Sequence, residues 1–251
     1  MDVSIIIPIR NQSLFVEICL ESIIKYTTVK YDIMLIDDDS NKETKDVLNK
    51  YSKYCELITN NEQKWLSYNW NLGAKLSKGK YICFLNSDTI VSKNWLEFLI
   101  EPFVELENIG LSGPTTSCCW GKQQHLKYHK NRFNLRNSVH KISEEVATQF
   151  ENDKYEFIDV VGFCFLTDSK IFKENNIYFD ETFKGPGNET DWILRIKEKS
   201  YKSIWAKKSY VHHFGRMSFN GDLGHEKAWN LWKEGDILLN KKYGRKISLV
   251  Q

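Results

Sequence analysis

The sequence has few of the residues that divide a chain into separate parts, and it has almost no excess charge. Its 251 residues include only 13 glycines and 4 prolines. Together these fall well below the roughly 12% of average usage and leave no flexible linker. The 35 Lys and Arg residues nearly balance 33 Asp and Glu residues, for a formal net charge of +2. We therefore expect one domain, and bulk charge indicates neither a nucleic-acid nor a membrane partner.

The sequence also lacks an apolar run of the roughly 18 residues that a membrane-spanning helix needs. The longest apolar stretch near the start, residues 3–9, is interrupted by Ser4 and Pro8 and follows no basic leader. It predicts neither a span nor a signal peptide. The six cysteines form no C-x-x-C pair of the kind that binds zinc. We interpret them as reduced, mostly buried thiols of a cytoplasmic protein, with a peripheral place at a membrane face left open.

Two phosphate-binding motifs are missing. No G-x-G-x-x-G follows the first apolar run, and G-x-x-x-x-G-K-[ST] occurs nowhere. Neither a dinucleotide fold of the usual kind nor a P-loop is therefore supported. The phosphates of a nucleotide would have to be held by a metal, and Mg²⁺ commonly takes one or two carboxylates plus substrate phosphates.

What the sequence does contain is an alternation of short apolar runs with helical periodicity. Residues 3–9 and 31–36 are typical of buried strands, and apolar residues recur at helical spacing between them. This order predicts a doubly wound α/β fold, in which ligands bind at the carboxyl ends of the strands. Further strands are expected at 56–59, 80–85, 157–167 and 202–205, and helices at 13–26, 41–54, 67–76, 169–175, 188–199 and 222–242. In the last helix, we interpret Trp229, Trp232 and Leu238 as a packing stripe rather than a sugar platform.

Acidic side chains follow two of the predicted strands. Asp37, Asp38 and Asp39 follow the second strand, and Asn86, Ser87 and Asp88 follow the strand at 80–85. Such residues are also good turn and cap residues, which would explain the clusters without any function. Three adjacent aspartates repel one another, however, and are usually tolerated where a cation or hydrogen-bond donors lie nearby. We therefore favour a functional site, in which Asp88 is a suitable ligand for a hard cation.

A basic segment, residues 120–141, contains no acidic residue. It is either a solvated loop or a site for an anionic acceptor. Nucleic acid is the weaker alternative, because few aromatic residues lie among the basic ones. The basic residues are Lys122, Lys127, Lys130, Arg132, Arg136 and Lys141.

Short motifs follow one another along the chain from residue 3 to about 219. They are the strand at 3–12, I-D-D-D-S at 36–40, N-L-G at 71–73, L-N-S-D at 85–88, F-D-E-T-F at 179–183, G-N-E-T-D-W-I-L-R at 187–195 and H-H-F-G at 212–215. In this order they resemble the motifs of glycosyltransferase family 2, whose members have the GT-A fold. The corresponding family motifs are its opening strand, V-D-D-G-S, N-x-G, the D-x-D metal motif, F-D-E-x-F, G-E-D-x-D-L-x-x-R and H-H-x-G.

The resemblance implies roles for individual residues. Asp88 takes the place of the carboxylate that holds Mn²⁺ or Mg²⁺. Adjacent histidines point opposite ways on an extended strand, so at most one of His212 and His213 faces the same site as Asp88. We choose His213 as a further metal or phosphate contact, because it directly precedes a Phe-Gly turn. Glu189 takes the place of the catalytic aspartate, with Asp191 as the second candidate. Asp38 takes the place of the aspartate that hydrogen-bonds the nucleotide base. The other residues expected to bind the nucleotide sugar are Pro8, Ile9, Arg10, Asn11, Asn71, Asn86 and Ser87.

The function that the resemblance implies is an inverting, metal-assisted transfer of a sugar from a UDP-, GDP- or dTDP-sugar to a hydroxyl acceptor. The acceptor would be a glycan or a lipid- or protein-linked saccharide, and an anionic one would suit the basic segment. A GT-A domain would span residues 1–220, with a nucleotide-binding half at 1–110, an acceptor-binding half at 111–220 and a C-terminal helical extension at 221–251. Because Asn86 and Glu189 depart from the family motifs, a noncatalytic nucleotide-sugar- or glycan-binding protein remains the alternative.

Overall fold

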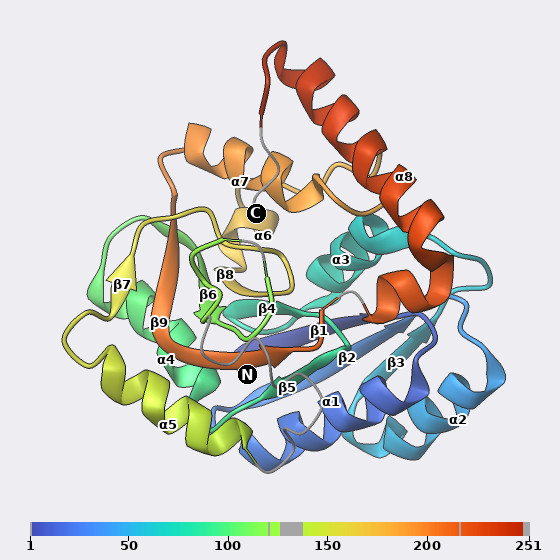
Figure 1. Cartoon of the computed structure of the whole chain (residues 1–251), viewed down its shortest axis with the longest axis horizontal. Coiled ribbons are helices and arrows are strands. Elements are labelled where there is room, and N and C mark those ends of the chain that lie inside the picture. Colours follow the sequence, from blue (N-terminus) through green and yellow to red (C-terminus); the bar gives the residue numbers. More distant parts are fainter. Residues whose placement is uncertain (1, 120, 126–137, 216, 248–251) are drawn as a thin grey trace.

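The computed structural model describes residues 2–119, 121–125, 138–215 and 217–247 (Figure 1). Its strands are β1 (Val3–Ile9), β2 (Tyr31–Asp37), β3 (Glu56–Thr59), β4 (Tyr81–Leu85), β5 (Thr89–Val91), β6 (Ile109–Thr115), β7 (Tyr155–Glu156), β8 (Cys164–Asp168) and β9 (Lys202–His213). Its helices are α1 (Ser13–Tyr26), α2 (Lys42–Tyr51), η1 (Ser52–Tyr54), α3 (Trp65–Leu76), α4 (Trp95–Glu105), α5 (Val139–Gln149), α6 (Lys170–Lys173), α7 (Asn188–Glu198) and α8 (Met217–Tyr243).

The strands form one twisted sheet in the order β3-β2-β1-β4-β8-β6-β9-β5, with β7 paired to β9. β3, β2, β1 and β4 pair in parallel. β8 runs antiparallel between β4 and β6, and β6 and β9 are again parallel. Most strands therefore run in one direction, so their carboxyl ends lie at one edge of the sheet. The predicted α/β class with a mostly parallel sheet is confirmed.

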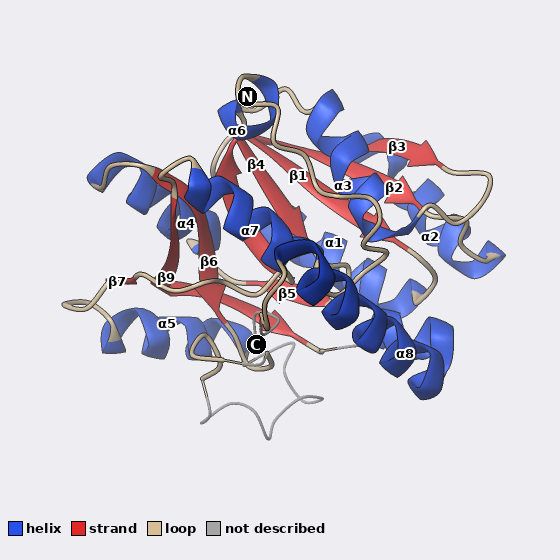
Figure 2. Ribbon diagram, turned by 90° about the horizontal axis from the view of Figure 1, so that it is seen from above, coloured by secondary structure: helices blue, strands red, loops and turns tan. Residues whose placement is uncertain are grey.

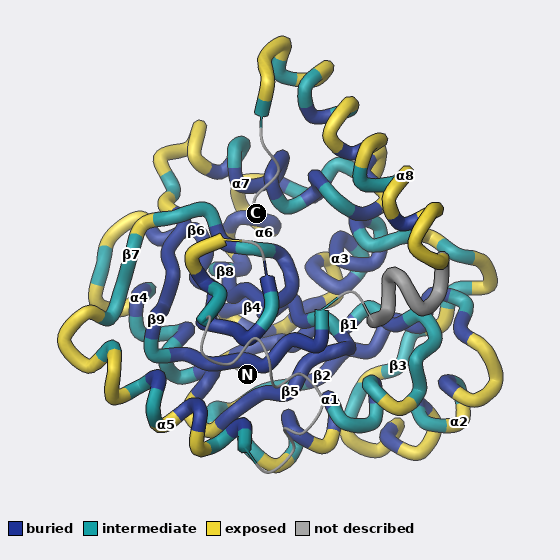
Figure 3. Tube along the Cα trace, viewed as in Figure 1, coloured by how far each residue is buried: buried dark blue, intermediate teal, exposed yellow. Residues whose placement is uncertain are grey.

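Helices cover both faces of the sheet. Successive residues of a strand point to opposite faces, and β1 follows this rule. Ile5 and Ile7 pack with α1, α2 and α4, whereas Ile6 packs with α3, α6 and α7. Figure 2 shows α7 and α8 together over one face, and Figure 3 shows strands buried along their length between the two helical layers.

The structure corrects three predicted elements. The strand predicted at 157–167 begins later and is β8, Cys164–Asp168, because the backbone amides of Val160 and Val161 donate to the side chains of Ser203 and Gln123 instead of to a neighbouring strand. The strand at 202–205 continues through His213 as β9. The helix expected at 169–175 is one short turn, α6. The six cysteines, all among the described residues, are free thiols and four of them are buried, as predicted.

The last helix, α8, packs on the loop that precedes α7. The helix is broken at Gly224, where φ is 76°. Farther along, Leu239 packs on Phe183. A Cβ added at Gly235 would lie 2.1 Å from the carbonyl oxygen of Pro186, so the two backbones are in direct contact. Among the described residues, no helix is long and apolar enough to cross a membrane. The proposed division of the chain near residues 110 and 220 stays a prediction.

Candidate active site

A cavity of about 170 Å³ lies between the end of β4 and the start of α7. Four residues predicted from the motifs line it together: Asn86, Asp88, Glu189 and His213. They come from the loop after β4, the first turn of α7 and the end of β9, and only the fold brings them together. The full lining is Leu66, Trp70, Asn86, Asp88, Val161, Gly162, Phe163, Gly185, Pro186, Asn188, Glu189, His213 and Trp232.

Pairing between β5 and the end of β9 places His213 beside Asp88. Thr89 lies opposite His213 in this antiparallel pair, and the amide of Phe214 donates to the Asp88 carbonyl at 3.0 Å. His213 Nε2 lies 3.4 Å from Asp88 Oδ1, and Asp88 is only 1% exposed. The neighbouring His212 points the other way, where its Nδ1 is 2.7 Å from the Ser117 hydroxyl. Of the two histidines, His213 is thus the one at the cavity.

The surroundings of His213 assign the proton on its ring. His213 Nδ1 is 2.9 Å from the carbonyl oxygen of Cys118, which can only accept, so Nδ1 carries a hydrogen and donates it. The ring is also stacked on Phe163, with centroids 4.8 Å apart. In the neutral ring, Nε2 then presents a lone pair toward the Asp88 carboxylate. Two lone pairs at this separation repel each other unless a proton or a cation lies between them.

This pair fits a divalent cation. Imidazole nitrogen and carboxylate oxygen are both ligands that Mn²⁺ and related ions accept. Within the described ranges, no group of three or more His, Cys, Asp or Glu side chains forms a complete metal site. The remaining ligands would come from Asn86, which lines the same cavity, and from substrate phosphates, as is usual for Mg²⁺.

Glu189 lies in the first turn of α7, across from Gly162. A Cβ added at Gly162 would lie 3.2 Å from three carbons of the Glu189 side chain, so the glycine makes room for it. Burial raises the pKa of the Glu189 carboxyl to about 7, although the backbone amides of Glu189, Gly162 and Gly187 act to lower it. A carboxyl with this pKa is partly ionised at neutral pH and is a suitable general base.

The raised pKa predicts a pH-dependent change in stability for Glu189→Gln. Because the folded-state pKa lies above the ordinary glutamate value of 4.5, protonated Glu189 stabilises the fold fully below about pH 4.5, and this contribution is lost as pH rises through about 7. Glutamine cannot ionise. We expect the Tm of Glu189→Gln relative to the parent chain to be higher at pH 8 than at pH 5, measured by calorimetry. Exposed Glu174→Gln is the control, and an equal Tm difference at both pH values would contradict the assignment.

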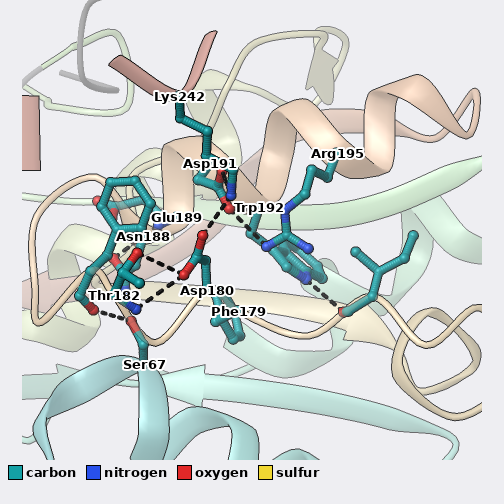
Figure 4. A network of polar contacts seen from close by, with 12 residues as sticks. Ser67, Phe179, Asp180, Thr182, Asn188, Glu189, Asp191, Trp192, Arg195 and Lys242 are labelled. Carbon is teal, nitrogen blue, oxygen red and sulfur yellow. Dashed lines mark hydrogen bonds and ion pairs between the residues drawn. The ribbon is translucent and has the colours of Figure 1, made fainter. Parts of the chain in front are cut away.

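Asp191, two residues farther along α7, does not line the cavity. Its side chain is fully buried in a cluster of charges (Figure 4). Arg195 Nε donates to its Oδ2 at 2.8 Å, and Lys242 Nζ and the Tyr243 hydroxyl contact its Oδ1 at 2.6 and 3.0 Å. Lys242 also reaches Asp180 at 2.6 Å. Burial acts to raise the pKa of Asp180, but hydrogen bonds from Lys242 and Thr182 prevail and lower it to about 2.

The residues expected to bind the nucleotide lie at the ends of β1 and β2. The Asp38 carboxylate accepts hydrogen bonds from the Asn60 side chain at 2.9 Å and from the amides of Lys64 and Trp65 at 2.7 and 3.0 Å. Arg10 Nη1 donates to the backbone carbonyl of Asp38 at 2.6 Å. These contacts shape the loop around Asp38, which does not line the cavity, and the predicted base contact stays a prediction.

The other residues predicted to bind the nucleotide sugar make structural contacts of different kinds. Asn71 joins α3 to the loop before α7, because its amide group bonds both the backbone N–H and the carbonyl of Phe179. Asn11 accepts a hydrogen bond from the amide of Asn41 at the start of α2. None of these residues lines the cavity, and their roles stay predictions. Pro8 is partly buried, and Ile9 and Ser87 are buried.

Two hydrogen-bond donors on the cavity wall were not predicted from the sequence. Asn188 Nδ2 and Trp70 Nε1 are buried and have no hydrogen-bond partner in the described part of the chain. Buried polar groups are normally hydrogen-bonded, so a ligand rich in oxygen acceptors, such as a sugar, would satisfy them. Asn188 precedes Glu189 in its motif, which was a usable signal. Trp70 gave no such signal, because it occupies an apolar position in the periodic pattern of its helix.

Most of the basic segment lies outside the described residues. Lys127, Lys130, Arg132 and Arg136 are among these, so the anionic-acceptor site expected there stays a prediction. Lys122 is described and pairs with Glu156 at 2.5 Å.

Comparison with known proteins places this chain among relatives of one kind. A family model described as glycosyl transferase family 2 matches residues 4–175. The minor teichoic acid biosynthesis protein GgaB of Bacillus subtilis (strain 168) is 32% identical over 96% of this chain and 26% of GgaB. The poly(ribitol-phosphate) beta-N-acetylglucosaminyltransferase TarP of Staphylococcus aureus (strain N315) is 25% identical over 89% of this chain and 68% of TarP.

A solved structure shows the same fold. The crystal structure of GalNAc-T7 with UDP, GalNAc and Mn²⁺ matches with a TM-score of 0.65 at 20% sequence identity, over 85% of this chain and 44% of that one. Two other curated relatives are matched over only 16% and 35% of their own lengths.

Proposed function

Because the chain belongs to glycosyl transferase family 2, we propose that it transfers a sugar from a nucleoside-diphosphate donor to a hydroxyl acceptor, with inversion at the anomeric carbon. The predicted family and the GT-A fold are confirmed by the family match and the structural likeness. One observation carries the proposed chemistry. Glu189, with a pKa suited to a base, lines the same cavity as the Asp88–His213 pair.

In this proposal, the Glu189 carboxylate takes the proton of the acceptor hydroxyl as the hydroxyl oxygen bonds to the anomeric carbon. The bond from that carbon to the diphosphate oxygen breaks, and its electron pair leaves with the diphosphate. Attack from the side opposite the leaving group inverts the anomeric centre. Asn188 Nδ2 and Trp70 Nε1 offer hydrogen bonds that orient sugar oxygens.

Asp88 and His213 would hold a divalent cation, with Asn86 as a neutral oxygen ligand. A cation bound there would neutralise the charge that develops on the leaving diphosphate. The Mn²⁺ named with the GalNAc-T7 structure supports this proposal.

The names of the relatives support an anionic acceptor. GgaB is named for minor teichoic acid biosynthesis and TarP for poly(ribitol-phosphate), a polymer that carries phosphate charges. We propose an acceptor of the same broad kind, a hydroxyl group on a negatively charged polymer.

The proposed reaction is tested with a panel of UDP-, GDP- and dTDP-sugars, each with and without Mn²⁺. We expect one of these donors to raise the Tm and to be slowly hydrolysed, since water can replace the acceptor. Binding without any turnover, with or without an acceptor polymer, would instead favour a noncatalytic binding protein.

For Asp88→Asn, we expect the metal-dependent part of donor binding to be lost while the Tm stays near that of the parent chain. The carboxylate supplies charge to the site, and asparagine keeps its size. Calorimetric titration of the donor with and without Mn²⁺ measures the effect, and Asp46→Asn, an exposed aspartate on α2, is the matched control. Unchanged donor affinity in the folded Asp88 variant would remove Asp88 from the site.

A further inference from the structure

One face of α8 is turned toward the candidate active site. Ala228, Trp232, Gly235, Leu239 and Lys242 follow one another at intervals of four and three residues, which places them on one side of the helix. Ala228, Gly235 and Leu239 are buried, and Lys242 reaches Asp180 and Asp191. The opposite side is open to solvent.

Within this face, Trp232 is the residue that lines the cavity. On one side it packs against the apolar cluster of Phe183 and Leu239. It is only partly buried, and it shares the cavity with Pro186 and Glu189. Trp229, on the same helix, is 54% exposed and does not line the cavity. The packing stripe expected from the sequence therefore accounts for part of the Trp232 surface, and Trp232 also lines the cavity.

On the turns that follow Trp232, α8 makes contacts that hold it against the rest of the protein. The backbone of Gly235 touches the Pro186 carbonyl, and Lys242 makes ion pairs of 2.6 Å with both Asp180 and Asp191 (Figure 4). The Tyr243 hydroxyl adds a hydrogen bond to Asp191. Moving Trp232 away from the cavity would break these contacts, so the indole ring is held in place before any ligand binds.

We infer that Trp232 is a stacking platform for a pyranose ring of the acceptor. This inference rests on the proposed function and names the acceptor side of that site. The base must reach the acceptor hydroxyl, so the acceptor has to approach Glu189, whereas the donor diphosphate belongs at Asp88 and His213. Trp232 comes from the α8 side, next to the loop that leads into Glu189. A flat indole presents its electron-rich face to the C–H groups of a sugar ring and leaves the ring hydroxyls free for hydrogen bonds.

The test compares Trp232→Leu with Trp232→Phe, which keeps an aromatic face, and with Trp229→Leu, the same change at the exposed tryptophan. The probes are methyl β-D-glucopyranoside, methyl N-acetyl-β-D-glucosaminide and the open-chain polyol ribitol. Saturation-transfer NMR of the protein, alone and with UDP, GDP or dTDP, measures their binding. Steady-state assays with the donor found in the panel measure the KM of each.

For at least one pyranoside we expect Trp232→Leu to raise the KM by about tenfold, which corresponds to the loss of one aromatic contact. This increase should be at least about fivefold larger than the increase in the KM of the donor. Saturation transfer to the ring C–H groups should fall in parallel. Trp232→Phe should stay within about threefold of the parent chain, and Trp229→Leu should match it. Ribitol should bind more weakly than the pyranosides and respond to none of the three changes.

Four results would overturn the inference. The first is a parent protein that binds no pyranoside, and the second is an unchanged pyranoside KM in Trp232→Leu. The third is an equal rise in the donor KM, which would place the donor ring on Trp232. The fourth is tighter binding of ribitol than of any pyranoside. Failure of the proposed function has a different signature. In that case no donor is turned over, and NMR still decides whether Trp232 stacks on a pyranose.

Discussion

Replacing Glu189 with Gln is expected to lower kcat by about 10²–10⁴-fold while the Kd of the donor stays within about threefold. The change removes the group that accepts the proton and keeps the shape of the side chain. Its effect is therefore confined to the transition state. Turnover at saturating donor and acceptor measures kcat, and titration with the donor measures Kd.

The same experiment has a pH signature. In the parent chain kcat should rise as pH increases through about 7, because Glu189 must be ionised to act as a base. The residual rate of Glu189→Gln should lack this rise, whereas exposed Glu174→Gln should keep it. A Glu189→Gln enzyme with most of its activity would show that another group takes the proton.

Replacing Asp191 with Asn is expected to lower the free energy of unfolding by about 3 kcal/mol, since it leaves the Arg195 and Lys242 charges without the buried carboxylate between them. Urea denaturation measures this loss. Asp180→Asn should cost less, because the Asp180 carboxylate is 28% exposed and water can replace it.

A double variant separates structure from catalysis at this position. If Asp191 and Lys242 stabilise each other, Asp191→Asn combined with Lys242→Met should destabilise the fold by less than the sum of the two single changes. A folded Asp191→Asn protein with normal stability and no turnover would instead make Asp191 the base and displace Glu189 from that role.

The parts of the fold that were predictable are those with strong local patterns. The β-branched run at Val3–Ile9 and the apolar periodicity of Ser13–Tyr26 are each sufficient to define an element, and both agree with the structure. For the site, the alternation of side chains along a strand predicted that at most one of His212 and His213 faces the cavity, and His213 is the one that lines it. The choice of His213 rested on its place before a Phe-Gly turn.

The parts that were not predictable depend on distant contacts. β6 contains Gly110, Gly113 and Pro114, which are unfavourable in strands, and it is held between β8 and β9. In β9, Lys207 interrupts the apolar pattern, but it remains in the strand because Asp153 and Glu156 neutralise its charge.

Contacts with residues distant in sequence also determine the surroundings of the two acids on α7, so these surroundings could not be predicted. In sequence, Glu189 and Asp191 are equivalent acids in the first turn of one helix. Only the folded chain shows that Glu189 packs against Gly162 and lines the cavity. Asp191 instead contacts Lys242 and Tyr243 at the end of α8.

The contact between Gly235 and Pro186 gives a way to compare acceptor sites across related sequences. Here the absence of a side chain lets α8 lie directly on the loop before α7, and Trp232 of α8 lines the same cavity as Glu189. On the acceptor assignment proposed above, a relative with a larger residue at the matching position must hold its helix farther out and leave a wider entrance for the acceptor. Reading that one position in an alignment would therefore sort relatives with narrow entrances from those with room for bulkier or branched acceptors.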